Sequence, residues 1–139
     1  LRERFGHISA ERALSGPGLV NLMNAISGID GNANPCTAPA EVTAAAAAGD
    51  PQAVRAVSMF CEFLGTVAGD IALTFGAAGG IYISGGIVPK LGDSFDRSGF
   101  RARFEDKGRF SDYLRAIPTC VVTAPCPALT GLRSLFMPD

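Results

Sequence analysis

The sequence has almost no net charge. Twelve Lys and Arg residues stand against thirteen Asp and Glu, which gives a formal charge of −1. No strong field therefore draws the chain toward phosphate backbones or anionic lipid surfaces. The composition predicts no nucleic-acid partner and no membrane partner.

The sequence also has few of the residues that bind transition metals. His7 is the single histidine, and the four cysteines are unevenly spread with no CxxC pair. Zinc sites need more such ligands at closer spacing, so we expect no metal site in this chain. Reduced thiols are typical of cytosolic proteins, and we predict a cytoplasmic location. The cysteines are Cys36, Cys61, Cys120 and Cys126.

A leader and an uninterrupted apolar span are missing as well. The chain starts at Leu1 without a methionine or a basic, apolar leader, which favours a fragment of a longer protein. Residues 71–89 are uncharged and about as long as a bilayer-spanning helix. Five glycines interrupt them, at positions 76, 79, 80, 85 and 86, and we expect a helix end, a strand and a turn instead.

The chain has ample material for a hydrophobic core. It contains 139 residues, of which 47% are hydrophobic and 18% charged. This length predicts one domain or a large piece of one. Ser9 is a candidate cap for a short helix over 10–15, and Gly16-Pro17 begins a second helix with apolar residues at helical spacing through Ile26. Residues 27–39 are rich in Gly, Asn, Asp and Pro and indicate a loop.

Two further helices follow that loop. An alanine-rich segment predicts a helix over 41–48 that Gly49 ends, and Asp50-Pro51 then caps a longer helix that reaches about residue 75. The longer helix is apolar around much of its circumference, so we expect burial on most sides. Its predicted core face consists of Val54, Val57, Cys61, Leu64, Val67, Ala68, Ile71 and Phe75.

Strands are predicted at only two places. Residues 80–84 (GIYIS) and 119–123 (TCVVT) are short and rich in β-branched residues. The charged stretch 90–115 between them predicts solvated helix and loop, with a helix starting at Pro89, and 128–136 predicts a final helix. Helices that alternate with strands indicate an α/β fold. Two strands are too few for a free-standing sheet, so we expect the remaining strands in sequence outside this chain.

Two candidate ligand sites emerge from local patterns. Ser84-Gly85-Gly86 follows an apolar strand, at the strand end where α/β proteins bind ligands, and glycine lets a nucleotide approach the backbone. A plain tight turn is the alternative. Glu11 lies in the first turn of a predicted helix, where its carboxylate could accept hydrogen bonds from two neighbouring sugar hydroxyls or could simply complement the helix dipole.

Other constellations are weaker. His7, beside the same turn, is a candidate general base or a structural hydrogen-bonding residue. Ser15-Gly16-Pro17-Gly18 resembles a phosphate loop but lacks the lysine and glycine spacing of a P-loop, which favours a turn between helices. The chain shows no nucleophile and base pair and no pair of carboxylates at a defined spacing.

Three stretches together resemble the bacterial glucokinase family of the hexokinase and actin-like superfamily. They are GHISAERALSGPGLVNL (6–22), GGIYISGGIVPKL (79–91) and SGFRARFEDKGRF (98–110). The resemblance implies part of an actin-like (ribonuclease H-like) ATPase domain, helix-rich with a few strands of a mixed sheet. It also implies that residues 1–139 form the carboxyl-terminal part of the large domain of a two-domain sugar kinase.

The resemblance further implies a function. Such enzymes use Mg2+ and ATP to phosphorylate D-glucose at its 6-hydroxyl in glycolysis, with an aspartate base that would lie upstream of Leu1, so no catalytic residue is expected in this chain. Glu11 corresponds to a glutamate that binds glucose at its anomeric side, and Ser84, Gly85 and Gly86 correspond to the adenosine motif. The helix that carries Gly65 and Gly69 resembles a segment connecting the two domains, where glycines would allow sliding or simply close packing.

Alternatives remain open. Another kinase of the superfamily could act on a different sugar, which a panel of glucose, mannose, fructose and N-acetylglucosamine would distinguish. A non-catalytic module that dimerises or regulates a partner is a further alternative. The resemblance implies only half of the sugar site and much of the adenosine site, so we expect the chain to be inactive alone. A piece of a two-domain enzyme also exposes former domain contacts, so we expect a homodimer, by packed faces or by domain swapping.

Overall fold

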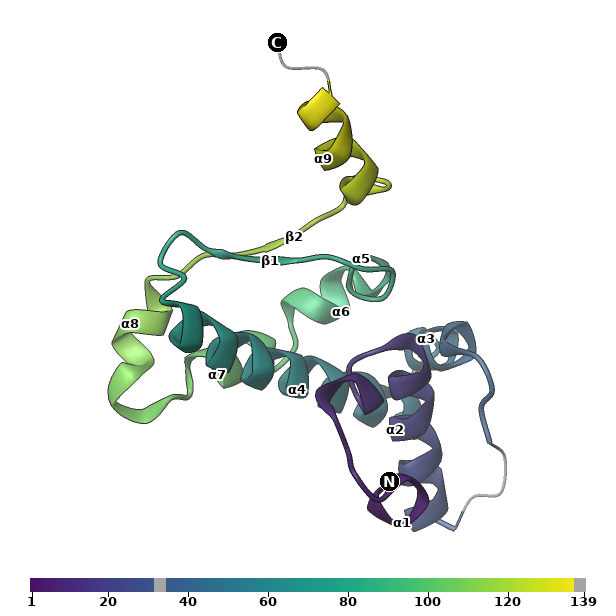
Figure 1. Cartoon of the computed structure of the whole chain (residues 1–139). Helices are drawn as coiled ribbons and strands as arrows, with labels where there is room; N and C mark the ends of the chain where they lie inside the picture. The colour runs from purple at the N-terminus through teal and green to yellow at the C-terminus, as the bar shows by residue number, and fades with distance from the viewer. Residues whose placement is uncertain (32–34, 137–139) are drawn as a thin grey trace.

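The structure, a computed structural model, describes residues 1–31 and 35–136 and is dominated by helices (Figure 1). In chain order the elements are α1 (Arg2–Phe5), η1 (Ala10–Arg12), α2 (Gly16–Ile29), α3 (Pro39–Ala47), α4 (Pro51–Phe75), β1 (Ile81–Ile83), α5 (Val88–Leu91), α6 (Asp93–Asp96), α7 (Phe100–Glu105), η2 (Gly108–Phe110), α8 (Ser111–Arg115), β2 (Thr119–Val121) and α9 (Pro127–Phe136).

The long helix α4 runs through the middle of the molecule, with α2 and α3 packed at one end and α7 along the other (Figure 1). Its predicted start is confirmed, because Asp50 Oδ1 accepts a hydrogen bond of 2.8 Å from the Ala53 amide. The helix ends at Phe75, where Gly76 takes the left-handed conformation at φ 59°. Left-handed backbone favours glycine, so the glycine-rich segment ends the helix as predicted.

The predicted core face of α4 is only partly right. Val57, Cys61 and Ala68 are buried, whereas Val54, Ile71 and Phe75 are exposed, Phe75 to 77%. The face that packs against other helices consists largely of small residues, namely Ala53, Ala56, Gly65, Ala68, Gly69 and Ala72. Burial on most sides is therefore wrong for this chain. Small residues thus make up most of the packed face, together with Val57, Phe60 and Cys61.

Two glycines bring α4 into backbone contact with α7. A Cβ at Gly65 would overlap the Phe100 carbonyl oxygen, and a Cβ at Gly69 would lie 2.6 Å from the Phe104 carbonyl oxygen. Real Cβ atoms are not found so close to backbone. Of the two interpretations of these glycines, the structure supports close packing.

The segment between the two strands is less solvated than predicted. Phe95, Phe100, Phe104 and Leu114 are buried in the core beside α4, with the rings of Phe95 and Phe100 4.9 Å apart. Most of the charged residues are exposed, but the Lys107 side chain is largely buried and donates to the Thr66 carbonyl of α4. The many charges in this stretch therefore predicted solvent exposure, which is wrong for its apolar residues.

Other boundaries differ modestly from the predictions. Residues 27–29, predicted as loop, continue α2, because Ile26 and Ser27 are buried and the Ser27 hydroxyl donates to Gln52 Oε1. The rest of that predicted loop includes residues 32–34, which lie outside the described residues. Helix α3 begins at Pro39, two residues early. The predicted helix over 10–15 is only the 3-10 turn η1, and Ser9 makes no side-chain cap to it.

The two predicted strands form a parallel pair. Ile81, Tyr82 and Ile83 of β1 are in register with Thr119, Cys120 and Val121 of β2. Within residues 1–31 and 35–136 no further strand joins them, so any mixed sheet would need strands from outside this chain. Beyond β2 the chain continues into α9, which projects away from the other helices and buries none of its residues (Figure 1).

Helix α4 is long and apolar enough to cross a bilayer by length and composition alone. However, 44% of the most apolar 18-residue stretch of α4 is buried inside the fold. A core helix of a soluble protein passes the same test, and the packing of α2, α3 and α7 against α4 fits that interpretation. The helix does not indicate a membrane protein.

We predict that Gly65→Ala destabilises the chain by about 1–3 kcal/mol or more, because the new methyl group meets the Phe100 backbone. Gly28→Ala is the matched control, since a Cβ in that helical position meets nothing within 4 Å. The control should stabilise the chain by about 0.5–1 kcal/mol. Urea unfolding followed by circular dichroism measures both, and equal stability of the two variants would contradict the packing described.

Candidate functional site

Glu11 lies on the short 3-10 turn η1, in its first turn as predicted, and its side chain is exposed. It forms part of the wall of a cavity of about 320 Å³. The other residues of the wall are predominantly polar: Ser9, Arg12, Ser15, Pro17 and Asn21. A carboxylate beside hydroxyl, amide and guanidinium groups suits a ligand with many hydroxyls, because each group can donate or accept a hydrogen bond.

The first turns of α2 hold the backbone around Glu11 in place. The Ser15 hydroxyl donates to the Glu11 carbonyl oxygen at 2.7 Å and accepts from the Gly18 amide at 3.0 Å. The Asn21 side-chain amide donates to the Arg12 carbonyl at 3.1 Å. At Gly18 a Cβ would lie 2.5 Å from the Ala13 backbone. Only glycine permits this approach between α2 and the turn.

A second cavity, of about 390 Å³, lies under the turn that follows β1. Ser84, Gly85 and Gly86 form one wall, and Phe60 and Leu64 of α4 form another. The cavity is also lined by Ser15 and Gly16, at the start of α2, and by Leu14, Ile83, Ile87 and Val88. The lining thus combines a glycine backbone with apolar side chains, a surface suited to a flat ring system.

The two glycines of this turn differ in their constraints. Gly85 adopts φ 135°, a conformation that other residues rarely take. Gly86 has no such constraint, and a Cβ there would meet nothing within 4 Å. A side chain at Gly86 would therefore fill space beside the turn without disturbing the packing.

Ser15 belongs to the walls of both cavities. The structure thus places Glu11 and the Gly85-Gly86 turn on either side of one residue, although more than seventy residues separate them in sequence. The sequence offered Ser15 only as part of a possible phosphate loop, for which a turn between helices was preferred. Its position immediately before Gly-Pro-Gly does signal a helix N-cap, and the side chain caps α2, but nothing in the sequence shows its second bond to Glu11.

The remaining sequence candidates have smaller roles. The predicted turn over Ser15 to Gly18 is instead the N-cap and first turn of α2, because the helix begins at Gly16 directly after Ser15. His7 is exposed, and it is not among the residues that line the Glu11 cavity. The described part of the chain supports neither a general-base role nor a structural hydrogen-bonding role for His7.

Two of the four cysteines, Cys36 and Cys61, are poor candidates for a nucleophile. Burial raises the pKa of the Cys61 thiol, and the Ser98 hydrogen bond only partly opposes that effect. Burial also raises the pKa of the Cys36 thiol, helped by the negative charges of Glu41 and Asp50. A raised pKa disfavours the nucleophilic thiolate. Over residues 1–31 and 35–136, no group of three or more His, Cys, Asp or Glu side chains is placed to hold a metal ion.

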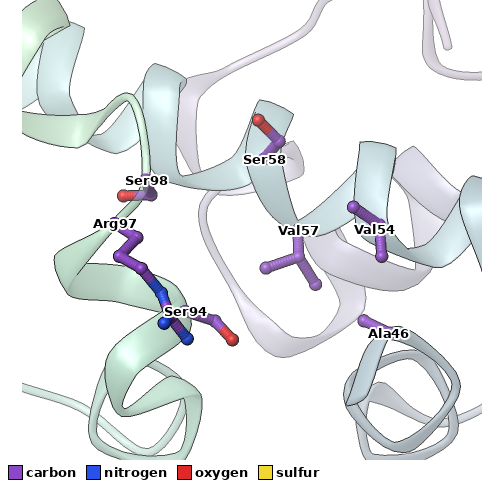
Figure 2. A pocket seen from close by; sticks show the side chains of 7 residues that line it. All are labelled: Ala46, Val54, Val57, Ser58, Ser94, Arg97 and Ser98. Carbon is purple, nitrogen blue, oxygen red and sulfur yellow. The ribbon is translucent and has the colours of Figure 1, made fainter. Parts of the chain in front are cut away.

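A separate cavity of about 210 Å³ lies between α3, α4 and α6 (Figure 2). Figure 2 shows Ser94, Arg97 and Ser98 on one side and Val54 and Ala46 on the other. Two of its hydroxyls are already engaged, because Ser58 bonds to Glu62 and Ser98 donates to the Phe95 carbonyl. This cavity contains none of the candidate ligand-binding residues that the sequence singled out.

Comparison with known proteins decides between the family interpretations. The family model described as Glucokinase matches residues 1–138. The chain therefore belongs to the glucokinase family. Both the Glu11 turn and the Gly-Gly turn lie within the matched residues.

Curated glucokinases are similar along nearly the whole chain. A glucokinase of Nitrobacter hamburgensis is 56% identical over 136 residues, which cover 97% of this chain and 42% of the relative. One from Aromatoleum aromaticum is 58% identical over 132 residues, 94% of this chain and 40% of the relative. The chain thus spans about two fifths of the length of these glucokinases.

A solved structure has the same fold. The crystal structure of a glucokinase from an Antarctic psychrotroph superimposes with a TM-score of 0.88 at 33% identity. The match covers 96% of this chain and 42% of the solved one. The predicted fold class, part of an actin-like sugar-kinase domain that is helix-rich with few strands, is therefore confirmed.

Proposed function

We propose that the complete gene product is an ATP-dependent glucokinase that phosphorylates D-glucose at the 6-hydroxyl in the cytoplasm. In this proposal residues 1–139 form the carboxyl-terminal part of its large domain. The observation that carries the proposal is the pair of cavities that meet at Ser15, one containing Glu11 and the other the Gly85-Gly86 turn. Kinase chemistry requires two substrates side by side, and these two cavities adjoin.

The two cavities suit the two substrates differently. The Glu11 carboxylate would accept hydrogen bonds from hydroxyls at the anomeric side of glucose, in a polar cavity whose backbone is held by α2. The Gly85-Gly86 turn would let adenosine lie against bare backbone, with Phe60 and Leu64 offering apolar contact. Phosphoryl transfer depends on such positioning and on charge stabilisation rather than on a protein nucleophile.

The catalytic base is not assigned to this chain. No Mg2+ ligand is assigned either, and the described residues hold no group of three or more His, Cys, Asp or Glu side chains placed to bind a metal ion. Mg2+ enters the proposal only as the usual companion of ATP. The described part of the chain therefore supplies substrate positioning, and we infer that it is inactive alone.

The first test is activity. We expect the complete gene product to produce ADP when glucose is present, with mannose, fructose and N-acetylglucosamine as poorer substrates, and we expect no turnover from residues 1–139 alone. A coupled ADP assay with both proteins, and with the chain plus a separately made amino-terminal part, measures this. Turnover by the chain alone would overturn its proposed half-site role, and preference for another sugar would overturn the proposed substrate.

The second test is binding at the two cavities. In the complete gene product, Glu11→Ala should weaken glucose binding at least tenfold, because a charge-assisted hydrogen-bond acceptor is lost. Gly86→Val should weaken binding of a non-hydrolysable ATP analogue while leaving glucose affinity nearly unchanged. Isothermal titration calorimetry measures both affinities.

Matched controls make these results specific. Glu3→Ala removes another exposed carboxylate, on α1. Gly79→Val adds a side chain at the other end of β1, where a Cβ also meets nothing within 4 Å. Neither control should change either affinity. If Glu3→Ala or Gly79→Val matched the corresponding site variant, the assignment of that cavity would fail.

We also propose that the chain in isolation forms a homodimer. Its exposed apolar side chains support this, since α9 exposes Leu129, Leu135 and Phe136 at 64%, 74% and 81%. A patch of this kind favours association. Sedimentation velocity from micromolar to millimolar concentration should show a dimer, and the double variant Leu129→Glu and Leu135→Glu should shift it toward monomer. A monomer over the whole range would contradict the proposal.

A further inference from the structure

Ser15 occupies a place in the fold that its role as a helix cap does not explain. A capping serine needs only to accept a hydrogen bond from the first turn of its helix. The Ser15 hydroxyl accepts that bond from the Gly18 amide and also donates to the Glu11 carbonyl oxygen. One small hydroxyl therefore joins the first turn of α2 to the residue that presents the proposed sugar carboxylate.

The second bond matters because it acts on Glu11 directly. Other contacts of η1 involve its neighbours, since the Arg12 guanidinium lies 4.5 Å from the centroid of the Phe5 ring and the Arg12 amide donates to the Ser9 carbonyl. The turn consists of only three residues, none of them buried, and Ser9 gives it no side-chain cap. Its contacts with α2 are the Ser15 bond to Glu11, the Asn21 bond to Arg12 and the close approach of Gly18 to Ala13. Of these three, the Ser15 bond is the only one made to Glu11 itself.

We propose that Ser15 is a positioning residue for glucose binding, which sets the backbone of Glu11 through its hydroxyl. This inference rests on the proposed function, because it requires that Glu11 binds the sugar. Loss of the hydroxyl frees the Glu11 carbonyl and lets the carboxylate sample orientations that do not fit the sugar. The effect should fall on glucose affinity, and the nucleotide cavity should be changed much less, because its glycine turn and the α4 side chains stay in place.

The experiment compares four variants in the complete gene product. Ser15→Ala removes the hydroxyl, and Ser15→Gly removes it while keeping a residue that is nearly as good at a helix N-cap. Ser15→Thr retains a hydroxyl. Asp50→Ala is the matched control, because it deletes the side-chain cap of α4, a bond of 2.8 Å to the Ala53 amide, and has no bond to Glu11.

We expect Ser15→Ala and Ser15→Gly to raise the KM for glucose about fivefold, the effect of one lost hydrogen bond, while kcat and the KM for ATP change less than twofold. Ser15→Thr should restore the wild-type KM. Asp50→Ala should lower the melting temperature about as much as Ser15→Ala does and leave the KM for glucose unchanged. With a glucose analogue that lacks the anomeric hydroxyl, the effect of Ser15→Ala should be smaller than with glucose.

The failures are distinguishable. If Glu11→Ala raises the KM for glucose but Ser15→Ala and Ser15→Gly behave like Asp50→Ala, Ser15 is a cap only and this inference is overturned while the proposed function stands. If the KM for ATP rises as much as that for glucose, the selective role is overturned. If Glu11→Ala leaves the KM for glucose unchanged, the proposed sugar site falls and the role of Ser15 falls with it.

Discussion

Helices α4 and α7 pack with their backbones in direct contact, and this pairing organises the middle of the molecule. Gly65 and Gly69 let the carbonyl groups of Phe100 and Phe104 approach α4 more closely than any side chain would permit. With α7 pressed to one part of the helix, α2 and α3 occupy the remainder. Phe60 and Leu64, on α4 as well, line the cavity under the Gly85-Gly86 turn.

The stretch 98–110, one of the three that resemble the glucokinase family, forms hydrogen bonds to α4 and to the segment that precedes β2. The Arg101 guanidinium donates to the carbonyl groups of Leu114, Arg115 and Ile117, at 3.2, 2.8 and 2.8 Å. These bonds fix the chain just before β2, and β2 in turn holds β1 in register. Lys107 donates to the Thr66 carbonyl and to Asp70 on α4. The positions of both strands, and so of the Gly85-Gly86 turn, follow from these bonds.

Local signals in the sequence predicted most elements, and non-local packing explains the errors. Asp50 and Pro51 placed the start of α4 because a capping side chain and a proline act within one helical turn. The buried face of α4 was mispredicted because large apolar residues such as Ile71 and Phe75 suggest a core, whereas Gly65 and Ala72 are buried through partners distant in sequence. The end of α2 was placed too early because Ser27 is stabilised by Gln52, from another helix.

The candidate site likewise has a part that local sequence signals predict and a part that depends on packing between distant segments. Glu11 and the Gly85-Gly86 turn could be predicted, each from a few neighbouring residues and a family resemblance. Their adjacency could not, since it arises only when α2 packs on α4 and brings Ser15 between the two cavities.

In the proposed function, the described residues position substrates. The walls offer the Glu11 carboxylate, the Arg12 guanidinium, hydroxyl and amide groups, and apolar surface. Phosphoryl transfer also needs a base and stabilisation of the transferred charge. In the proposed function, groups outside these residues supply both.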